Sequence, residues 1–109
     1  MFELWQTEWC PASRRVRERL TELGVDYVVR QVPVEKDERM ALVQAARTDT
    51  IPALVTGDGA PLVGEDAIRG YLDEHFTEPS QADAHRIKAE KARRRYLEEE
   101  CGCPQPATR

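Results

Sequence analysis

The stretch Trp9-Cys10-Pro11-Ala12-Ser13 separates a short apolar run, residues 2–6, from an arginine-rich helical pattern. Proline is favoured at the first position of a helix, where its missing N–H has no intrahelical partner to lose. This placement makes Cys10 the predicted N-cap, with its sulfur facing the unpaired amides of the first turn. Because those amides and the helix dipole favour a negative group, a thiolate there is stabilised. The stretch therefore predicts a strand, a helix and a reactive sulfur between them.

Cysteine usage leaves a second interpretation of Cys10 open, since free cysteines are often buried and structural. The other two cysteines, Cys101 and Cys103, lie in a tail with glycine and proline. This is not the disulfide framework of a small secreted protein. The tail thiols could be incidental, form a strained disulfide, supply two ligands to a metal, or resolve an adduct on Cys10.

Composition indicates a soluble globular chain. It has 109 residues, 40% of them hydrophobic and 33% charged, which is enough for one domain with a single core. The net charge of −4 argues against general nucleic-acid binding. No apolar run approaches the length of a membrane span and no leader pattern opens the chain, so we expect no membrane partner and a cytoplasmic location.

Hydrophobic periodicity predicts the order strand, helix, strand, helix, strand, strand, helix, with one appended helix. The first two strands with their helix form a parallel βαβ unit, and a glycine turn at 57–59 predicts an antiparallel pair. We therefore expect an α/β fold with a four-stranded mixed sheet and helices on both faces. The predicted strands are 2–6, 25–34, 53–56 and 61–63. The predicted helices are 11–23, a second helix that follows the lead-in residues 36–39 and ends near Arg47, 64–76 and 80–100. The predicted domain spans 1–78, followed by a charged helix, 79–100, and a flexible tail, 101–109.

Three landmarks in this order resemble the thioredoxin fold, specifically the glutaredoxin and glutathione S-transferase N-terminal-domain group. They are Cys10-Pro11-Ala12-Ser13 after the first strand, Thr50-Ile51-Pro52 before the third strand, and Gly64-Glu65-Asp66 at the start of the last core helix. The resemblance covers about residues 2–76. It implies a thioredoxin-like fold (βαβαββα) with a cis peptide bond before Pro52.

The resemblance also implies a thiol site of the glutathione type. Cys10 would be the nucleophile, and Ser13 stands where dithiol members have their second cysteine, as in a monothiol thiol–disulfide oxidoreductase. The co-substrate would be glutathione or another low-molecular-weight thiol, and the partners would be glutathionylated or otherwise disulfide-bonded proteins. No metal is expected. The residues implied to bind the thiol ligand are Trp9, Pro11, Arg39, Thr50, Ile51, Pro52, Glu65 and Asp66.

The implied roles differ within this set. The backbone of Ile51 would pair with the peptide-like ligand, and Glu65 and Asp66 would take its amino end, with the helix N-terminus taking its carboxylate. Arg39 lies roughly where some members use a cation for the other carboxylate. Trp9 would line the site.

The chain departs from the family pattern close to the sulfur. Gln6 stands where many glutaredoxins have a lysine, and the nearby Glu8 is expected to oppose ionisation of the thiol. Arg14 and Arg15 offset that effect if they fold back over the site.

Two alternative functions stay open at this point. A non-catalytic thioredoxin-fold module would hold a partner in the same groove and use the charged last helix as a docking surface. An iron–sulfur carrier is the less favoured alternative, because the family motif for that role is Cys-Gly-Phe-Ser.

Overall fold

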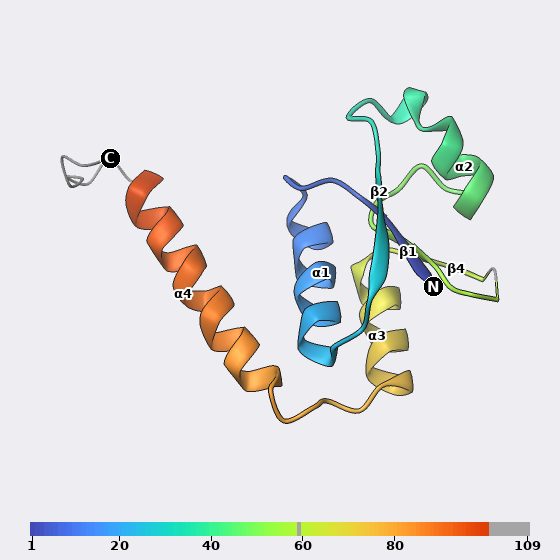
Figure 1. The fold of residues 1–109 in the computed structure, drawn as a ribbon. Helices are drawn as coiled ribbons and strands as arrows, with labels where there is room; N and C mark the ends of the chain where they lie inside the picture. The colour runs from blue at the N-terminus through green and yellow to red at the C-terminus, as the bar shows by residue number, and fades with distance from the viewer. Residues whose placement is uncertain (59, 101–109) are drawn as a thin grey trace.

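The computed structural model describes residues 1–58 and 60–100. The predicted tail, with Cys101 and Cys103, lies outside these residues. The order of elements is the predicted one (Figure 1). The strands are β1 (Phe2–Gln6), β2 (Tyr27–Gln31), β3 (Ala53–Val55) and β4 (Pro61–Val63). The helices are α1 (Pro11–Leu23), a 3₁₀ turn η1 (Lys36–Glu38), α2 (Met40–Ala46), α3 (Glu65–His75) and α4 (Ala82–Glu100).

The four strands form one mixed sheet in the order β2-β1-β3-β4. Strands β1 and β2 are parallel, with Leu4 opposite Val29. Strand β3 pairs antiparallel with both β1 and β4, so Leu54 lies opposite Leu4 on one side and Leu62 on the other. This mixed sheet, with its helices, is the thioredoxin-like fold expected from the sequence.

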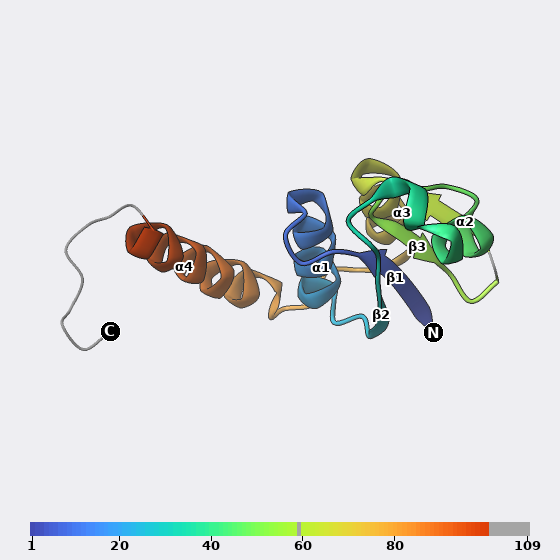
Figure 2. The same ribbon diagram turned by 90° about the horizontal axis from the view of Figure 1, so that it is seen from above.

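Alternation along the strands divides the core between the two faces of the sheet, with α2 across the sheet from α1 and α3 (Figure 2). Leu4 and Leu54 are fully buried and pack with α1 and α3. Their neighbours Trp5 and Ala53 belong to the cluster on the α2 side. The larger cluster consists of Leu4, Val16, Leu20, Leu23, Leu54, Ile68 and Leu72.

Helix α1 has the bounds that the sequence predicts. Cys10 is its N-cap and Pro11 its first residue. Gly24 ends the helix in the left-handed region, with φ 69° and ψ 29°, and its N–H donates to the carbonyls of Leu20 and Thr21. Because a residue with a Cβ is strained at that φ, glycine is the natural stop.

One predicted element is shorter in the structure, and one predicted lead-in segment has a defined turn. Strand β2 covers five residues instead of 25–34, because it lies at the sheet edge and its length is set by its single neighbour, β1. The residues predicted to lead into the second helix form the 3₁₀ turn η1, and Arg39, with φ −90° and ψ 44°, separates this turn from α2. The side chain of Arg39 explains the break, as described with the site.

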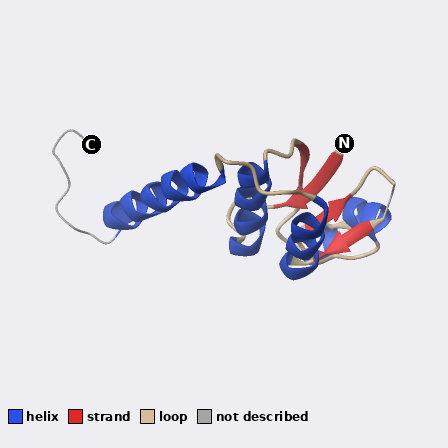
Figure 3. Ribbon diagram, turned by 90° about the horizontal axis from the view of Figure 1, so that it is seen from below, coloured by secondary structure: helices blue, strands red, loops and turns tan. Residues whose placement is uncertain are grey.

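Helix α4 lies beyond α1, on the side away from the sheet (Figures 1 and 3). Among the α4 side chains that the structure describes, only Ala82 is a buried apolar residue. Ion pairs to α1 hold the helix: Arg86 lies 3.1 Å from Glu22, and Arg93 pairs with Glu18. Neither α4 nor any other helix in the described residues has the length and apolar content of a membrane span.

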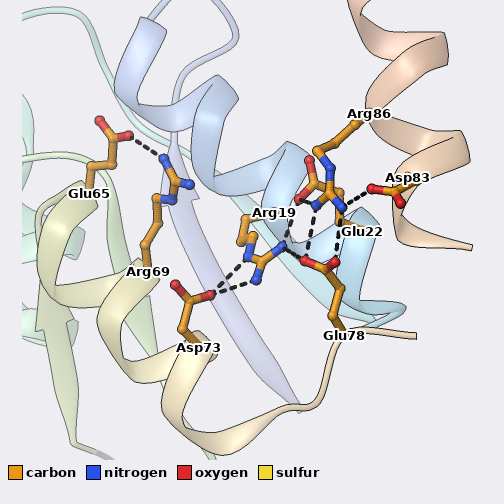
Figure 4. Close-up of polar contacts among 8 residues, drawn as sticks. All are labelled: Arg19, Glu22, Glu65, Arg69, Asp73, Glu78, Asp83 and Arg86. Atoms are coloured by element: carbon orange, nitrogen blue, oxygen red, sulfur yellow. Dashed lines mark hydrogen bonds and ion pairs between the residues drawn. The ribbon is translucent and has the colours of Figure 1, made fainter. Parts of the chain in front are cut away.

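Glu78, in the connection between α3 and α4, is shared by arginines of two helices (Figure 4). Hydrogen bonds from Arg86 and then from Arg19 lower the pKa of the Glu78 carboxyl to about 2. Asp83, in the first turn of α4, pairs with Arg86 of the same helix.

Candidate thiol site

Cys10 occupies the N-cap of α1 with an extended backbone, φ −78° and ψ 118°. Its sulfur accepts a hydrogen bond from the Ser13 amide, with an N···S distance of 3.4 Å. Cys10 is partly buried, and Pro11 beside it is exposed. The sulfur therefore takes the place that Ser, Thr or Asp oxygens fill at most helix starts.

The surroundings of the sulfur favour its ionised form. Partial burial raises the pKa of the Cys10 thiol, but the Ser13 hydroxyl, the amides of Ser13 and Ala12 and the charge of Arg15 outweigh it. The net pKa lies below its ordinary value. The Ser13 hydroxyl is fully buried and has no hydrogen-bond partner in good geometry among the described residues. An ionised sulfur is the acceptor that this hydroxyl lacks.

Glu8, which was expected to oppose ionisation, is engaged with other groups. It accepts a hydrogen bond from the Gln6 amide at 3.0 Å and lies 3.6 Å from Arg17. It is not among the groups that shift the pKa of the Cys10 thiol. Gln6 is fully buried and also accepts a hydrogen bond from Arg17. Gln6, which stands where many glutaredoxins have a lysine, therefore hydrogen-bonds both Arg17 and the Glu8 carboxylate at the end of β1.

The start of α3 joins the thiol helix to the loop before β3. The Ile51–Pro52 peptide bond is cis, and the Pro52 carbonyl accepts the Gly64 N–H at 2.8 Å. Gly64 has φ 90°, a conformation that side chains with a Cβ rarely adopt. The next residue, Glu65, accepts a hydrogen bond at 2.7 Å from Arg15 of α1.

Glu65 is shared between two arginines. Its second partner is Arg69, at 3.3 Å on the same helix. The hydrogen bond from Arg15 is the main cause that lowers the pKa of the Glu65 carboxyl, and Arg69 adds to it against partial burial. Because Arg15 also acts on the Cys10 sulfur, one guanidinium connects the thiol to the first turn of α3.

Arg39, which the resemblance implied as a ligand-binding cation, is buried and bound to backbone carbonyls. Its side chain is 5% exposed, and its guanidinium donates to the carbonyls of Pro33 (2.8 Å), Val34 (2.9 Å) and Asp49 (2.7 Å). These bonds fix the loop after β2 against the loop that leads to Ile51. The geometry therefore assigns Arg39 to loop structure, and we leave it out of the proposed ligand contacts.

Three further predicted residues are exposed. Trp9 is 62% exposed in the loop before Cys10. Thr50 is exposed, and its N–H donates to the Thr48 hydroxyl at 3.0 Å. Asp66 is exposed in the first turn of α3, where its charge acts on Arg15. These three side chains are open to a ligand.

Sequence reasoning missed one member of this arrangement, Arg69. The signal was present, because Glu65 and Arg69 are four residues apart on one helix, a spacing at which opposite charges meet. Arg15 was expected only as a possible offset to Glu8, since nothing in the sequence pairs it with a residue fifty positions away.

No group of three metal-ligating side chains occurs within residues 1–58 and 60–100. His75 stacks on Tyr71 with ring centroids 4.0 Å apart.

A thioredoxin-like sheet with a thiol at the first turn of α1 and a cis-proline loop beside α3 defines a class, the thioredoxin-fold thiol proteins. Within that class the chain belongs to the glutathione S-transferase N-terminal domain family, whose model matches residues 4–80. A comparison with curated protein sequences gave no match.

Solved structures of glutathione S-transferases are similar to this chain. A glutathione S-transferase from Rhodospirillum rubrum F11 is 32% identical, with a TM-score of 0.62, over 73% of this chain and 36% of that one. A glutathione S-transferase from Methylobacillus flagellatus KT, solved with glutathione bound, is 25% identical, with a TM-score of 0.60, over 69% of this chain and 37% of that one. The match therefore spans little more than a third of these transferases.

A glutaredoxin from buckwheat, solved as a complex with glutathione, shares the fold. It is 22% identical, with a TM-score of 0.54, over 67% of this chain and 68% of the glutaredoxin.

Proposed function

We propose that the protein is a monothiol glutaredoxin-like thiol–disulfide oxidoreductase of the cytoplasm that uses Cys10 and glutathione or another low-molecular-weight thiol. The observation that carries this proposal is the partly buried sulfur at the start of α1, whose pKa lies below its ordinary value because polar contacts and Arg15 outweigh burial. A thiolate fraction at neutral pH and access to the sulfur are the two requirements of thiol–disulfide exchange.

The reaction consists of two exchanges. The Cys10 thiolate attacks the small-thiol sulfur of a protein mixed disulfide, forming a Cys10 mixed disulfide and releasing the protein thiolate, which takes a proton. A second small thiol, as its thiolate, then attacks the adduct. It leaves as the symmetrical disulfide and restores the Cys10 thiolate. Electrons balance, because two small thiols become one disulfide while the protein disulfide is reduced. Ser13 has no sulfur with which to resolve the adduct, so the second thiol is required.

The ligand would lie between the first turns of α1 and α3. The position of Ile51 directly before the cis proline supports pairing of its backbone with a peptide-like thiol. Glu65 and Asp66, with the helix N-terminus, supply opposite charges for an ammonium and a carboxylate. Trp9 is exposed enough to cover the ligand, and Pro11 and Thr50 border it. Arg15 and Arg69 would hold the Glu65 carboxylate in place.

The test is turnover of a peptide–glutathione mixed disulfide with added glutathione, together with mass spectrometry of the protein. We expect wild-type protein to carry one glutathione on Cys10 during turnover, and Cys10→Ser to lose both the adduct and the activity. The Cys101→Ser/Cys103→Ser double variant is the matched control, because it removes two thiols and keeps Cys10. If Cys10→Ser retained turnover, the proposal would be wrong. If neither wild-type protein nor Cys10→Ser showed turnover while both bound glutathione equally, a non-catalytic binding module would be the better description.

A further inference from the structure

A polar hollow of about 250 Å³ lies between α1, α3 and α4, and we name it the arginine groove. Two carboxylates line it, Glu18 and Glu22. Its five arginines are Arg14, Arg15, Arg19, Arg69 and Arg93. The chain as a whole carries a net charge of −4, so this lining differs from the average surface.

The carboxylates of the groove are already paired. Glu18 accepts a hydrogen bond from Arg93, and Glu22 accepts from Arg19 at 2.8 Å. Outside the lining, Asp73 and Glu78 also pair with Arg19. These pairs balance much of the charge, but they do not exhaust the hydrogen-bond donors of the arginines.

The arginines of the groove have many more N–H donors than they use in side-chain hydrogen bonds. A guanidinium carries five N–H donors, and Arg15, Arg69 and Arg93 each use one in a side-chain hydrogen bond. Arg14 makes no ion pair or side-chain hydrogen bond with any residue whose side chain the structure describes. Close to half of each of Arg15 and Arg69 is exposed. The groove therefore offers unused donors in a forked geometry that suits carboxylates.

The groove begins one helical turn from the reacting sulfur. The Arg14 amide donates to the Cys10 carbonyl at 3.0 Å. At 1.5 Å of rise per residue, Arg14 lies roughly 6 Å along the helix axis from Cys10, and Glu22 roughly 18 Å. An extended peptide advances about 3.3–3.6 Å per residue. A substrate whose leaving cysteine lies beside the Cys10 site during exchange therefore passes the arginines with residues about two to five positions from that cysteine.

We infer that the arginine groove docks an acidic segment of the protein whose mixed disulfide Cys10 attacks; this inference rests on the proposed function. Substrates with Asp or Glu two to five positions from the reacting cysteine are selected over substrates with neutral residues there. The proposed partner is a polypeptide and not a nucleic acid, because a chain with a net charge of −4 is a poor match for a continuous phosphate backbone.

The first experiment compares exchange rates on three peptides, each joined to glutathione through its cysteine. One peptide has glutamates at positions two to five from the cysteine, one has glutamines there, and one has glutamates at positions nine to twelve. We expect kcat/KM for the first peptide to exceed the other two by about three- to tenfold at low salt, as for a few exposed ion pairs. The advantage disappears at high ionic strength. Equal rates for the three peptides would overturn the inference.

Variants locate the effect in the groove. Arg14→Gln/Arg93→Gln removes two lining charges, and Arg30→Gln/Arg95→Gln removes two exposed charges outside the groove. We expect the first pair to lose the preference for acidic peptides and to keep its rate on cysteine–glutathione disulfide. The second pair keeps both. Arg14→Gln alone, which leaves the contact between α1 and α4 intact, reduces the preference partly. Equal losses in the two double variants would show an effect of net charge and refute a local groove.

A binding measurement separates failure of the groove from failure of the chemistry. Fluorescence anisotropy of the labelled acidic peptide, in reduced form, is measured on Cys10→Ser and on Cys10→Ser/Arg14→Gln/Arg93→Gln. Weaker binding to the triple variant supports the groove even if wild-type protein turns over no disulfide. Equal binding to both proteins overturns it. Tighter binding of a labelled single-stranded oligonucleotide than of the acidic peptide also overturns it, because the groove would then recognise phosphates.

Discussion

Replacing Ser13 with alanine removes a single oxygen atom beside the reacting sulfur. That hydroxyl is buried, is without a partner in good geometry among the described residues, and contributes to lowering the pKa of the Cys10 thiol. In Ser13→Ala the main-chain amides and Arg15 still act on the sulfur, while one donor is lost. We therefore expect the pKa of the Cys10 thiol to rise.

The size of the effect follows from the kind of hydrogen bond that is lost. A hydrogen bond to a charged group contributes about 1.5–3 kcal/mol. The lower end applies to Ser13, because the amides of Ser13 and Ala12 remain. About 1.4 kcal/mol corresponds to a tenfold change in the ratio of thiolate to thiol. At a pH well below the pKa, the Ser13→Ala variant should be alkylated roughly tenfold more slowly than wild-type protein.

The assay is the rate of iodoacetamide alkylation of Cys10 as a function of pH, read by mass spectrometry of the peptide that contains it. The two proteins should differ at mildly acidic pH and converge once both sulfurs are ionised. Ser80→Ala, the same change at an exposed position, is the control and should match wild-type protein. Thermal unfolding at low pH should be unaffected, since the hydroxyl has no strong acceptor when the thiol is protonated. Identical alkylation profiles for Ser13→Ala and wild-type protein would refute the reasoning.

Three further predictions concern the scaffold. Arg39→Lys should lower the free energy of unfolding in urea by about 2–3 kcal/mol, because a lysine ammonium lacks the planar fork with which the guanidinium reaches three carbonyls. The control, Arg30→Lys at the exposed sheet edge, should change the free energy of unfolding by less than about 0.5 kcal/mol. Arginines of α4 and α1 hold the pKa of the Glu78 carboxyl at about 2, below its ordinary value of 4.5. The ion pairs of Glu78 therefore stabilise the docking of α4 fully above pH 4.5, and this stabilisation is lost as the pH falls to about 2. Hydrogen exchange of α4 amides should accelerate over that interval in wild-type protein, while Glu78→Gln should exchange faster already at neutral pH. Leu54→Ala should lose about 2–5 kcal/mol of unfolding free energy from a fully buried site, and Val63→Ala, at a position 38% exposed, should lose under about 1 kcal/mol.

Local rules were sufficient for the helix that carries the thiol. Pro11 and Gly24 mark its two ends through backbone chemistry that acts within a few residues. The alternation that buries Leu4 and turns Trp5 to the other face is equally local. The thioredoxin-like order of elements follows from such signals.

The parts that sequence reasoning could not place depend on side chains that meet across the fold. Arg39 looks like a free cation in the sequence, and only the folded chain shows that it binds carbonyls as far away as Asp49. Glu8 is two residues from Cys10 in sequence, yet its carboxylate accepts a hydrogen bond from Gln6 and forms an ion pair with Arg17. The pairing of Arg15 with Glu65 joins α1 to α3 and forms only when both helices pack side by side on the same face of the sheet.

The atom proposed to react in this protein is also the atom that caps α1. Folding stability and redox state are therefore linked at Cys10. A thiolate is a strong hydrogen-bond acceptor for the first-turn amides, and a disulfide sulfur is a weak one. The first turn of helix α1 is therefore less stable in the adduct than in the reduced protein. By thermodynamic linkage, every contact that favours the thiolate makes the adduct easier to reduce. The start of one helix thus sets both the reactivity of the sulfur and the direction in which its exchange runs.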